Sequence, residues 1–378
     1  GSMRGVFIVS LLFVLISCSQ SAPISNFTLP YIVEVPPILE SWYSVIQFAV
    51  DDINNNSSLL PDTFIDLELL YAETIPAAIE ALIEYSERNL TLVCGNEFDE
   101  PLEYTGVVAT TYGVAQLSPT ATTPLLSDDQ QFPYFSRIIG TGHYQILSLI
   151  DTLEELSRQG KGWTDVAIVV SSREYGIELA ETFLGNVGDS FNVLSYQQFL
   201  VYSDNFEIEL NEIKSSGARV ILLLCYVLES EEFLLAADEY GLIGENYVWA
   251  TTDSIVGSGG IVGYGAAQNL MRGMLGTFEY LPNSGEYYDS FVERWVNETD
   301  PVQYPGSGVV PGAFLLFIYD HIMIAAEVIE ELMNEGLLDD YPNTKVSPEI
   351  WKDRIRQVEH EGLTGHITFK ESGDRLSQ

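Results

Sequence analysis

The chain has 378 residues, 46% of them hydrophobic, and this length exceeds the usual size of a single hydrophobic core, so two domains are expected. The formal net charge is −39, from 16 Lys and Arg against 55 Asp and Glu. This charge argues against nucleic acid and anionic membrane surfaces as partners, because few cations could neutralise phosphates. The hydrophobic content argues against a disordered acidic chain, so the acidic residues are expected to cover a solvated surface.

The N-terminus has the features of a targeting segment. Gly1-Ser2 is typical of a cloning remnant, and Met3-Arg4 with the apolar run 5–16 predicts a signal peptide, too short to span a membrane. Leu15-Ile16-Ser17-Cys18 also fits a bacterial lipoprotein box, with Cys18 as lipid anchor. Eukaryotic secretion is favoured by five Asn-x-Ser/Thr sequons, at Asn26, Asn55, Asn56, Asn89 and Asn297. Residues 1–21 are thus assigned to the remnant and signal, and the mature chain is expected outside the cell.

Apolar runs alternate with helical patterns along the rest of the chain, which predicts an α/β fold of βαβ units with parallel sheets. In the first half, strands are predicted at 29–35, 65–71, 90–94, 114–117 and 135–139, and helices at 39–54, 76–87 and 102–112. After glycines at 140 and 142, a second series has helices at 143–158, 177–187, 206–215 and 229–240, and strands at 166–170, 193–199, 220–225 and 247–250. Strand 273–280 should cross back, helices 287–296 and 312–333 should belong to the first lobe, and strand 366–369 to the second.

One stretch, from Leu117 to Asp128, is rich in small hydroxyl residues and directly follows a predicted strand. Pro119 cannot continue a central strand, so the chain should open into a loop there. Loops at the carboxyl ends of parallel strands are where small ligands usually bind in such sheets. An ordinary strand-to-helix turn is the alternative, since Ser, Thr and Pro are common in turns.

The order and spacing of several motifs resemble the type I periplasmic-binding-protein fold, over residues 28–375. Leucine/isoleucine/valine-binding proteins have this fold, as do the ectodomains of metabotropic glutamate, GABA-B and natriuretic-peptide receptors. The motifs are Ala49–Asn54, Leu117–Asp128, Phe132–Arg137, Asp165–Gly176, Val248–Asp253, Tyr319-Asp320 and Gly362–Phe369. The resemblance implies two Rossmann-like lobes joined by a three-stranded hinge. We assign 22–140 plus 278–343 to lobe 1 and 141–277 plus 344–378 to lobe 2, with crossings near Gly140, Gly276 and Tyr341-Pro342.

The resemblance also implies where an amino-acid-like ligand would bind. Thr122, through its hydroxyl, and Thr120 and Ala121, through backbone amides, match the residues that hold a ligand carboxylate. Tyr175 matches a tyrosine that covers the ligand, and Tyr226 a further aromatic contact. Asp253 matches the acidic residue that receives the ammonium group. The alternatives are a packing role for Tyr175 and a helix N-cap or turn role for Asp253.

One loop departs from the family pattern of glycine followed by serines. Here it is Cys94-Gly95-Asn96-Glu97-Phe98-Asp99-Glu100, in which Phe98 or Asp99 replaces a serine that would hold the carboxylate. Either these acids point to solvent, or Asp99 belongs to the binding site and the ligand is a cation or amide without an α-carboxylate.

Signatures of enzymes are missing from the sequence. It has no Walker loop, no Gly-x-Ser-x-Gly and no His-Glu-x-x-His, its four histidines lack metal spacing, and the glycines between 257 and 265 fit a flexible turn better than a phosphate loop. Cys94 and Cys225 end apolar strands and are expected to be buried free thiols; a disulfide across the cleft is the alternative.

The sequence therefore predicts an extracellular domain, without cofactor or metal, that binds a small polar ligand, amino-acid-like or an amine. Hinge closure would serve uptake or signalling, with a membrane receptor or transporter as a possible partner. The alternative is a receptor-type interaction module with a vestigial cleft that forms a homodimer through lobe 1.

Overall fold

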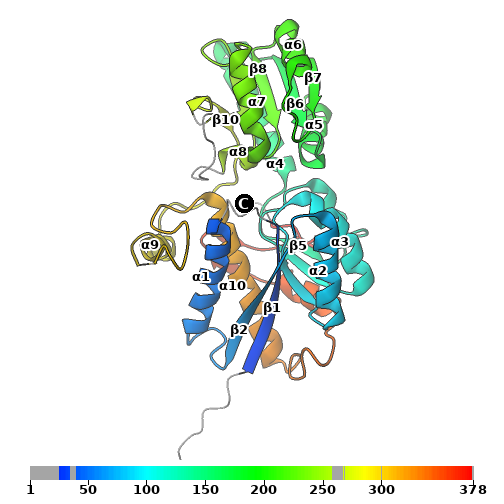
Figure 1. Cartoon of the computed structure of the whole chain (residues 1–378), viewed down its shortest axis with the longest axis vertical. Helices are drawn as coiled ribbons and strands as arrows, with labels where there is room; N and C mark the ends of the chain where they lie inside the picture. Colours follow the sequence, from blue (N-terminus) through cyan, green and yellow to red (C-terminus); the bar gives the residue numbers. More distant parts are fainter. Residues whose placement is uncertain (1–24, 35–39, 258–266, 268, 299, 377–378) are drawn as a thin grey trace, which may run out of the picture.

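The computed structural model describes residues 25–34, 40–257, 267, 269–298 and 300–376. The predicted signal peptide and most of the glycine-rich stretch 257–265 lie outside these residues, so the structure tests neither the signal peptide nor the flexible turn predicted there. Figure 1 shows two lobes stacked along the long axis, with the middle third of the sequence, in green, forming the upper lobe.

Each lobe is built on a five-stranded sheet whose neighbouring strands are all parallel. The order in the first sheet is β2-β1-β3-β4-β5, with β1 (Ser25–Val33), β2 (Thr63–Tyr71), β3 (Leu92–Gly95), β4 (Ala115–Ser118) and β5 (Phe135–Arg137). Its helices are α1 (Glu40–Asn55), α2 (Ile75–Glu87), α3 (Asp99–Tyr112), η2 (Pro124–Ser127), α9 (Glu286–Glu293), η5 (Arg294–Glu298), α10 (Ala313–Asn334) and α11 (Pro348–Ile355). The predicted α/β class with parallel sheets is thus confirmed.

The second sheet has the order β10-β9-β8-β6-β7 and is parallel throughout. Its strands are β6 (Asp165–Ser171), β7 (Asn192–Phe199), β8 (Val220–Leu224), β9 (Val248–Thr251) and β10 (Leu275–Gly276). Its helices are α4 (Gly142–Leu156), which continues into η3 (Ser157–Lys161), α5 (Glu174–Asn186), α6 (Glu207–Ser216), α7 (Val227–Glu239) and α8 (Asp253–Val256). All five residues of β8 are buried, because helices cover both faces of a parallel sheet, and this explains its unbroken apolar sequence.

The C-terminal segment differs from the sequence prediction, which placed residues 344–378 in the second lobe. Trp351 and Ile355 of α11, and Ile367 of the hairpin β11 (His360–Gly362) and β12 (Gly365–Ile367), pack into the same apolar cluster as β1 and α10. Tyr341 stacks on Phe27 at 5.0 Å between ring centroids, so the chain does not leave the first lobe at Tyr341-Pro342. The segment therefore belongs to the first lobe, because its large apolar side chains are buried there.

Three segments meet where the lobes join. The Gly140 amide, at the first crossing, donates to Glu279, which follows the crossing back from β10, at 2.9 Å. Arg375 lies 3.8 Å from Glu279 and donates to the Ile138 carbonyl at 3.0 Å. The third segment of this junction is therefore the stretch around Arg375.

Helix α10 is rich in buried apolar side chains, and one acidic residue lies among them. Its Asp320 is fully buried and accepts hydrogen bonds from the amides of Leu363 and Thr364, both at 2.8 Å. Among the described residues, no helix combines the length and the apolar character needed to cross a membrane.

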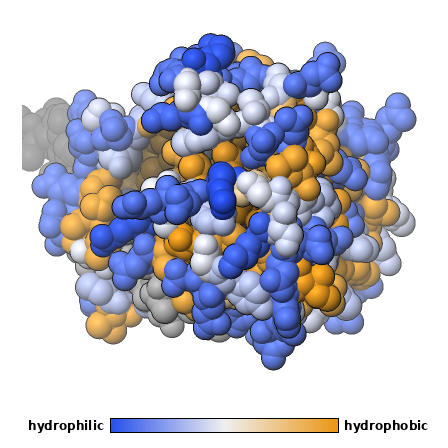
Figure 2. All heavy atoms as spheres, turned by 90° about the horizontal axis from the view of Figure 1, so that it is seen from above, coloured by the Kyte–Doolittle hydropathy of each residue, from blue (hydrophilic) through white to orange (hydrophobic). Residues whose placement is uncertain are grey.

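The surface is polar, as the net charge predicts. Figure 2 shows hydrophilic side chains spread over the end of the molecule, with smaller apolar areas between them. Cys94 and Cys225 are buried and free, one in each lobe, which confirms the prediction made for them.

Candidate ligand-binding cleft

A cavity of about 540 Å³ lies between the two lobes, at the carboxyl ends of the strands of both sheets. It is within the size range of small-molecule sites. The structure brings together six of the seven predicted site residues in its lining, namely Asp99, Thr120, Thr122, Tyr175, Tyr226 and Asp253. Ala121 is fully buried within the Thr120–Thr123 loop and is not among the lining residues.

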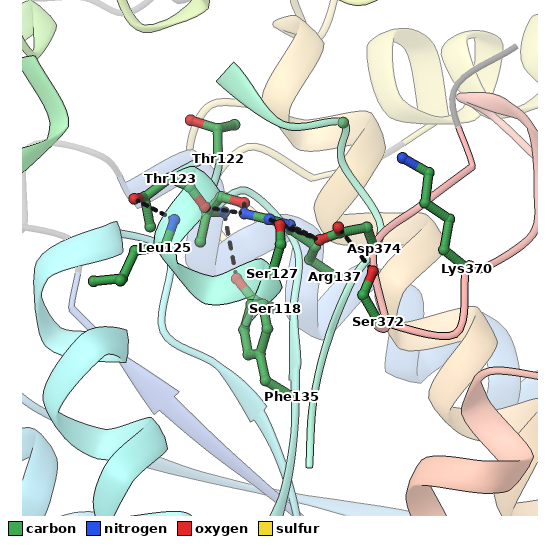
Figure 3. A network of polar contacts seen from close by, with 12 residues as sticks. Ser118, Thr122, Thr123, Leu125, Ser127, Phe135, Arg137, Lys370, Ser372 and Asp374 are labelled. Atoms are coloured by element: carbon green, nitrogen blue, oxygen red, sulfur yellow. Dashed lines mark hydrogen bonds and ion pairs between the residues drawn. The ribbon is translucent and has the colours of Figure 1, made fainter. Parts of the chain in front are cut away.

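The loop Thr120–Thr123 is held from below by a buried arginine. Arg137, at the end of β5, donates to the carbonyls of Ala121 and Thr123 at 3.3 and 2.7 Å, and pairs with Asp374 at 2.7 Å. Figure 3 shows this network, with Arg137 between the loop and the C-terminal segment. A fully buried guanidinium in this position defines the loop's backbone, because its fork of donors needs acceptors at fixed places.

The departing loop after β3 turns inward rather than to solvent. Gly95 has φ +98°, and a Cβ there would lie 2.2 Å from the Ile32 carbonyl, so only glycine permits this close turn. It directs Glu97 and Asp99 into the protein, and each of them is 2% exposed. Of the two alternatives for these acids, the solvent-exposed one is therefore excluded.

Asp99 contacts the loop that the sequence analysis singled out. Its Oδ1 accepts from the amides of Thr122 and Thr123 at 2.6 and 2.8 Å, and its Oδ2 from the hydroxyl of Tyr226 at 3.1 Å. The Thr120 hydroxyl donates to the Glu97 carbonyl at 2.8 Å. Asp99 thus connects the loop of the first lobe with an aromatic residue of the second.

The second lobe contributes an aromatic wall and a carboxylate. The rings of Tyr175 and Tyr226 stack with centroids 4.5 Å apart, and Phe98 meets Tyr226 edge-on at 5.3 Å. The Tyr175 hydroxyl donates to Asp253 Oδ1 at 2.7 Å. Asp253 is also the first residue of α8, and its carboxylate accepts from the Ser254 amide, so it has both the predicted cleft position and a turn role.

Two lining residues were missed by the sequence analysis. Glu34 directly follows β1, and its carboxylate accepts from the Phe98 amide at 3.3 Å. Arg173 follows β6 and bridges the lobes by pairing with Glu100 of the first and Glu229 of the second. Arg173 comes just after the predicted strand 166–170, and this position was the signal that could have identified it, whereas Glu34 lay inside the predicted strand 29–35, which ends at Val33 in the structure.

Burial dominates the electrostatics of the cleft. It raises the pKa of Glu97 to about 7 and that of Asp99 to about 6. Burial, and then the nearby Glu97 charge, raise the pKa of Glu34 well above its usual range. Eight acidic residues and one basic residue line the cavity among the described residues. Within the same residues, no cluster of His, Cys, Asp and Glu has the arrangement of a metal site.

Curated relatives of the chain include receptors. It is 26% identical over 275 residues to "Metabotropic glutamate receptor-like protein E" of Dictyostelium discoideum, covering 70% of this chain and 31% of the relative. It is 25% identical over 348 residues to "Glutamate receptor 3.7" of Arabidopsis thaliana, covering 86% of this chain and 36% of the relative. The chain therefore spans about a third of the length of these relatives.

Solved structures with the same fold include two bacterial binding proteins. One is an ABC transporter substrate-binding protein from Desulfitobacterium hafniense in complex with Leu, with TM-score 0.71, 17% identity, and coverage of 94% of this chain and 96% of the other. The second is the branched-chain amino acid transporter substrate-binding protein LivJ from Streptococcus pneumoniae in complex with isoleucine, with TM-score 0.72, 15% identity, and coverage of 93% and 94%.

The family described as "Receptor family ligand binding region" matches residues 41–378. This match agrees with the cleft between two lobes and with the predicted resemblance, and it supports a binding protein rather than an enzyme. The chain belongs to the family of receptor ligand-binding regions.

Proposed function

We propose that the protein binds a small amino-acid-like or amine ligand in the cleft between its lobes, outside the cell, for uptake or signalling. The observation that carries this proposal is the cavity of about 540 Å³, to which both lobes contribute polar and aromatic side chains. The Leu and isoleucine complexes of the two bacterial neighbours support an amino-acid-like ligand in this fold. The predicted signal peptide and the four sequons whose asparagines are exposed, Asn26, Asn55, Asn56 and Asn297, support secretion and glycosylation.

Closure of the lobes on the ligand follows from the division of the site. Thr122 and Asp99 come from the first lobe, whereas Tyr175 and Asp253 come from the second. A ligand that touches both sets is bound best when the lobes are together, and this difference in affinity drives closure. Arg173 and Tyr226 supply contacts across the cleft that a closed state would use.

A thermal-shift screen with amino acids and amines tests the proposal. A ligand that binds only the folded state at 100 times its Kd stabilises the protein by about 2.7 kcal/mol. Small-angle scattering with a confirmed ligand then tests closure, with a smaller radius of gyration as the expected result. No stabilisation by any compound would contradict ligand binding, and an unchanged radius at saturation would contradict closure.

A second proposal is dimerisation through the first lobe. Helix α3 exposes three large hydrophobic side chains, Tyr104, Val107 and Tyr112, which are 52%, 46% and 39% exposed. We expect light scattering to show a concentration-dependent dimer that Val107→Glu abolishes. Val302→Glu is the control, because Val302 is 88% exposed and lies outside α3. A wild-type monomer at all concentrations would refute this proposal.

A further inference from the structure

The turn after β4 already contains an anion. The amides of Thr122 and Thr123 both point to Asp99 Oδ1, at 2.6 and 2.8 Å. Adjacent backbone N–H groups of this kind form a concave anion-binding site. Because the Asp99 carboxylate occupies it, neither amide remains for the carboxylate of a ligand.

The cavity around Asp99 holds further acidic side chains, and the described residues supply no cation for them. Glu34, Glu97 and Asp253 line the same cavity and are 7%, 2% and 3% exposed. Within the described part of the chain, none of them forms an ion pair with Lys, Arg or His. The basic lining residue, Arg173, is held between Glu100 and Glu229 and does not reach these groups by an ion pair.

Glu34 gives an independent sign that a donor is needed. Its Oε2 accepts from the Phe98 amide, but its buried Oε1 has no hydrogen-bond partner among the described residues. A buried carboxylate oxygen without a partner is costly, and a donor supplied by a ligand would remove that cost. Glu34 is one of the residues that line the cavity, so a ligand in the cavity lies next to this side chain.

The apolar part of the lining suits an organic cation rather than a bare ion. Tyr175 and Tyr226 form a stacked pair beside the carboxylates, and Phe98 and Trp42 also line the cavity. Aromatic faces attract ammonium groups and cover the carbon skeleton that carries them. The volume of about 540 Å³ also exceeds what one small ion would fill.

We propose that Asp99 takes the place of a ligand carboxylate, so that the cleft binds organic amines that carry an ammonium group and no carboxylate. This inference rests on the proposed ligand-binding function of the cleft. In the bound state, the ammonium group donates to the buried acids and the aromatic rings cover the carbon chain. An α-amino acid would place a second carboxylate near Asp99, whose own carboxylate already takes the amides of Thr122 and Thr123.

Calorimetry with matched pairs tests the inference, using the wild-type protein. Each pair has the same side chain and differs only in the carboxylate: agmatine and arginine, cadaverine and lysine, tyramine and tyrosine, isoamylamine and leucine. For the pair that binds, we expect the amine to bind roughly a hundredfold or more tightly, since like charges in a desolvated site repel strongly. Glu34→Gln should weaken amine binding about tenfold, because it removes an acid that a bound ammonium group would hold in the ionised form, and one acceptor oxygen. Glu80→Gln, an equal charge change at an exposed position on α2, should leave it unchanged.

Asp99→Ser shifts the selectivity towards the amino acid if the inference is right. It frees the amides of Thr122 and Thr123, so the amino acid of the pair should gain at least tenfold in affinity relative to its amine. Circular dichroism verifies folding, and if this variant does not fold, the wild-type pairs and Glu34→Gln decide the question. Tight binding of amino acids with no binding of amines would overturn the inference while supporting the proposed function. Binding of neither class would overturn both.

Discussion

The buried pair of Arg137 and Asp374 offers a sharp test of how the binding loop is held. The Arg137 side chain is 0% exposed and that of Asp374 is 6% exposed, with 2.7 Å between Nη2 and Oδ1. We expect Asp374→Ala to lower the free energy of unfolding by about 3–5 kcal/mol, because it leaves a buried guanidinium without its counter-charge. The remaining partners of Arg137, two carbonyls and the Ser127 hydroxyl, are neutral and cannot replace the carboxylate.

Urea unfolding followed by the fluorescence of the five tryptophans measures the change. Glu155→Ala is the matched control, because Glu155 pairs with Arg158 on the surface, where the side chains are 50% and 67% exposed. An exposed pair of this kind contributes about 0.2–1 kcal/mol. A loss of less than about 1 kcal/mol in Asp374→Ala would refute the view that this pair holds the loop.

The pair of Arg137 and Asp374 should also make the free energy of unfolding depend on pH. Burial alone would raise the pKa of Asp374, but the charge of Arg137 and its hydrogen bonds outweigh burial and lower it. The stabilisation is therefore present above the ordinary pKa of an aspartate and is lost as pH falls through the lowered value. Asp374→Ala should accordingly flatten this part of the acid-unfolding curve.

Three further predictions concern the cleft and the cores. Asp253→Ala should abolish binding of an ammonium-bearing ligand while the fold persists; calorimetry checks this against Asp353→Ala on the surface, and unchanged affinity would contradict it. Cys94 and Cys225 are buried, and burial raises the pKa of both thiols. We expect both to react with iodoacetamide only once the protein is denatured, with no reductant added, and labelling of the native protein would contradict this. Glu97 has a pKa of about 7 in the folded protein, so the folded state binds one more proton than the unfolded state between about pH 4.5 and 7. The free energy of unfolding should therefore fall by about 3 kcal/mol as the pH rises through this window. Glu97→Gln should reduce the slope of stability against pH in urea unfolding, with Asp99 and Glu34, whose pKa values are also raised, accounting for the rest; an unchanged slope would contradict the role of Glu97.

Much of the fold could be read from local patterns. The short, unbroken apolar run of β8 is typical of a buried strand, and the longer apolar pattern of α10 is typical of a helix. Both can be predicted locally, because the type of element depends on the length and period of its own apolar residues. The carboxyl-end rule for parallel strands also led to the Thr120–Thr122 loop, because it depends only on where strands stop, whereas Tyr226 and Asp253 came from the family resemblance.

Only the tertiary structure decided how these pieces meet. The pairing of Arg137 with Asp374 joins residues 237 positions apart, and no local period encodes it. The packing of α11 into the first lobe likewise depends on which apolar surface its Trp351 finds. For Asp99 the sequence left open whether the acid faces solvent or the cleft. In the structure, the turn at Gly95 directs Asp99 into the protein, and the amides of Thr122 and Thr123 donate hydrogen bonds to its carboxylate. These donors come from another segment of the chain, and they offset the cost of burying the carboxylate.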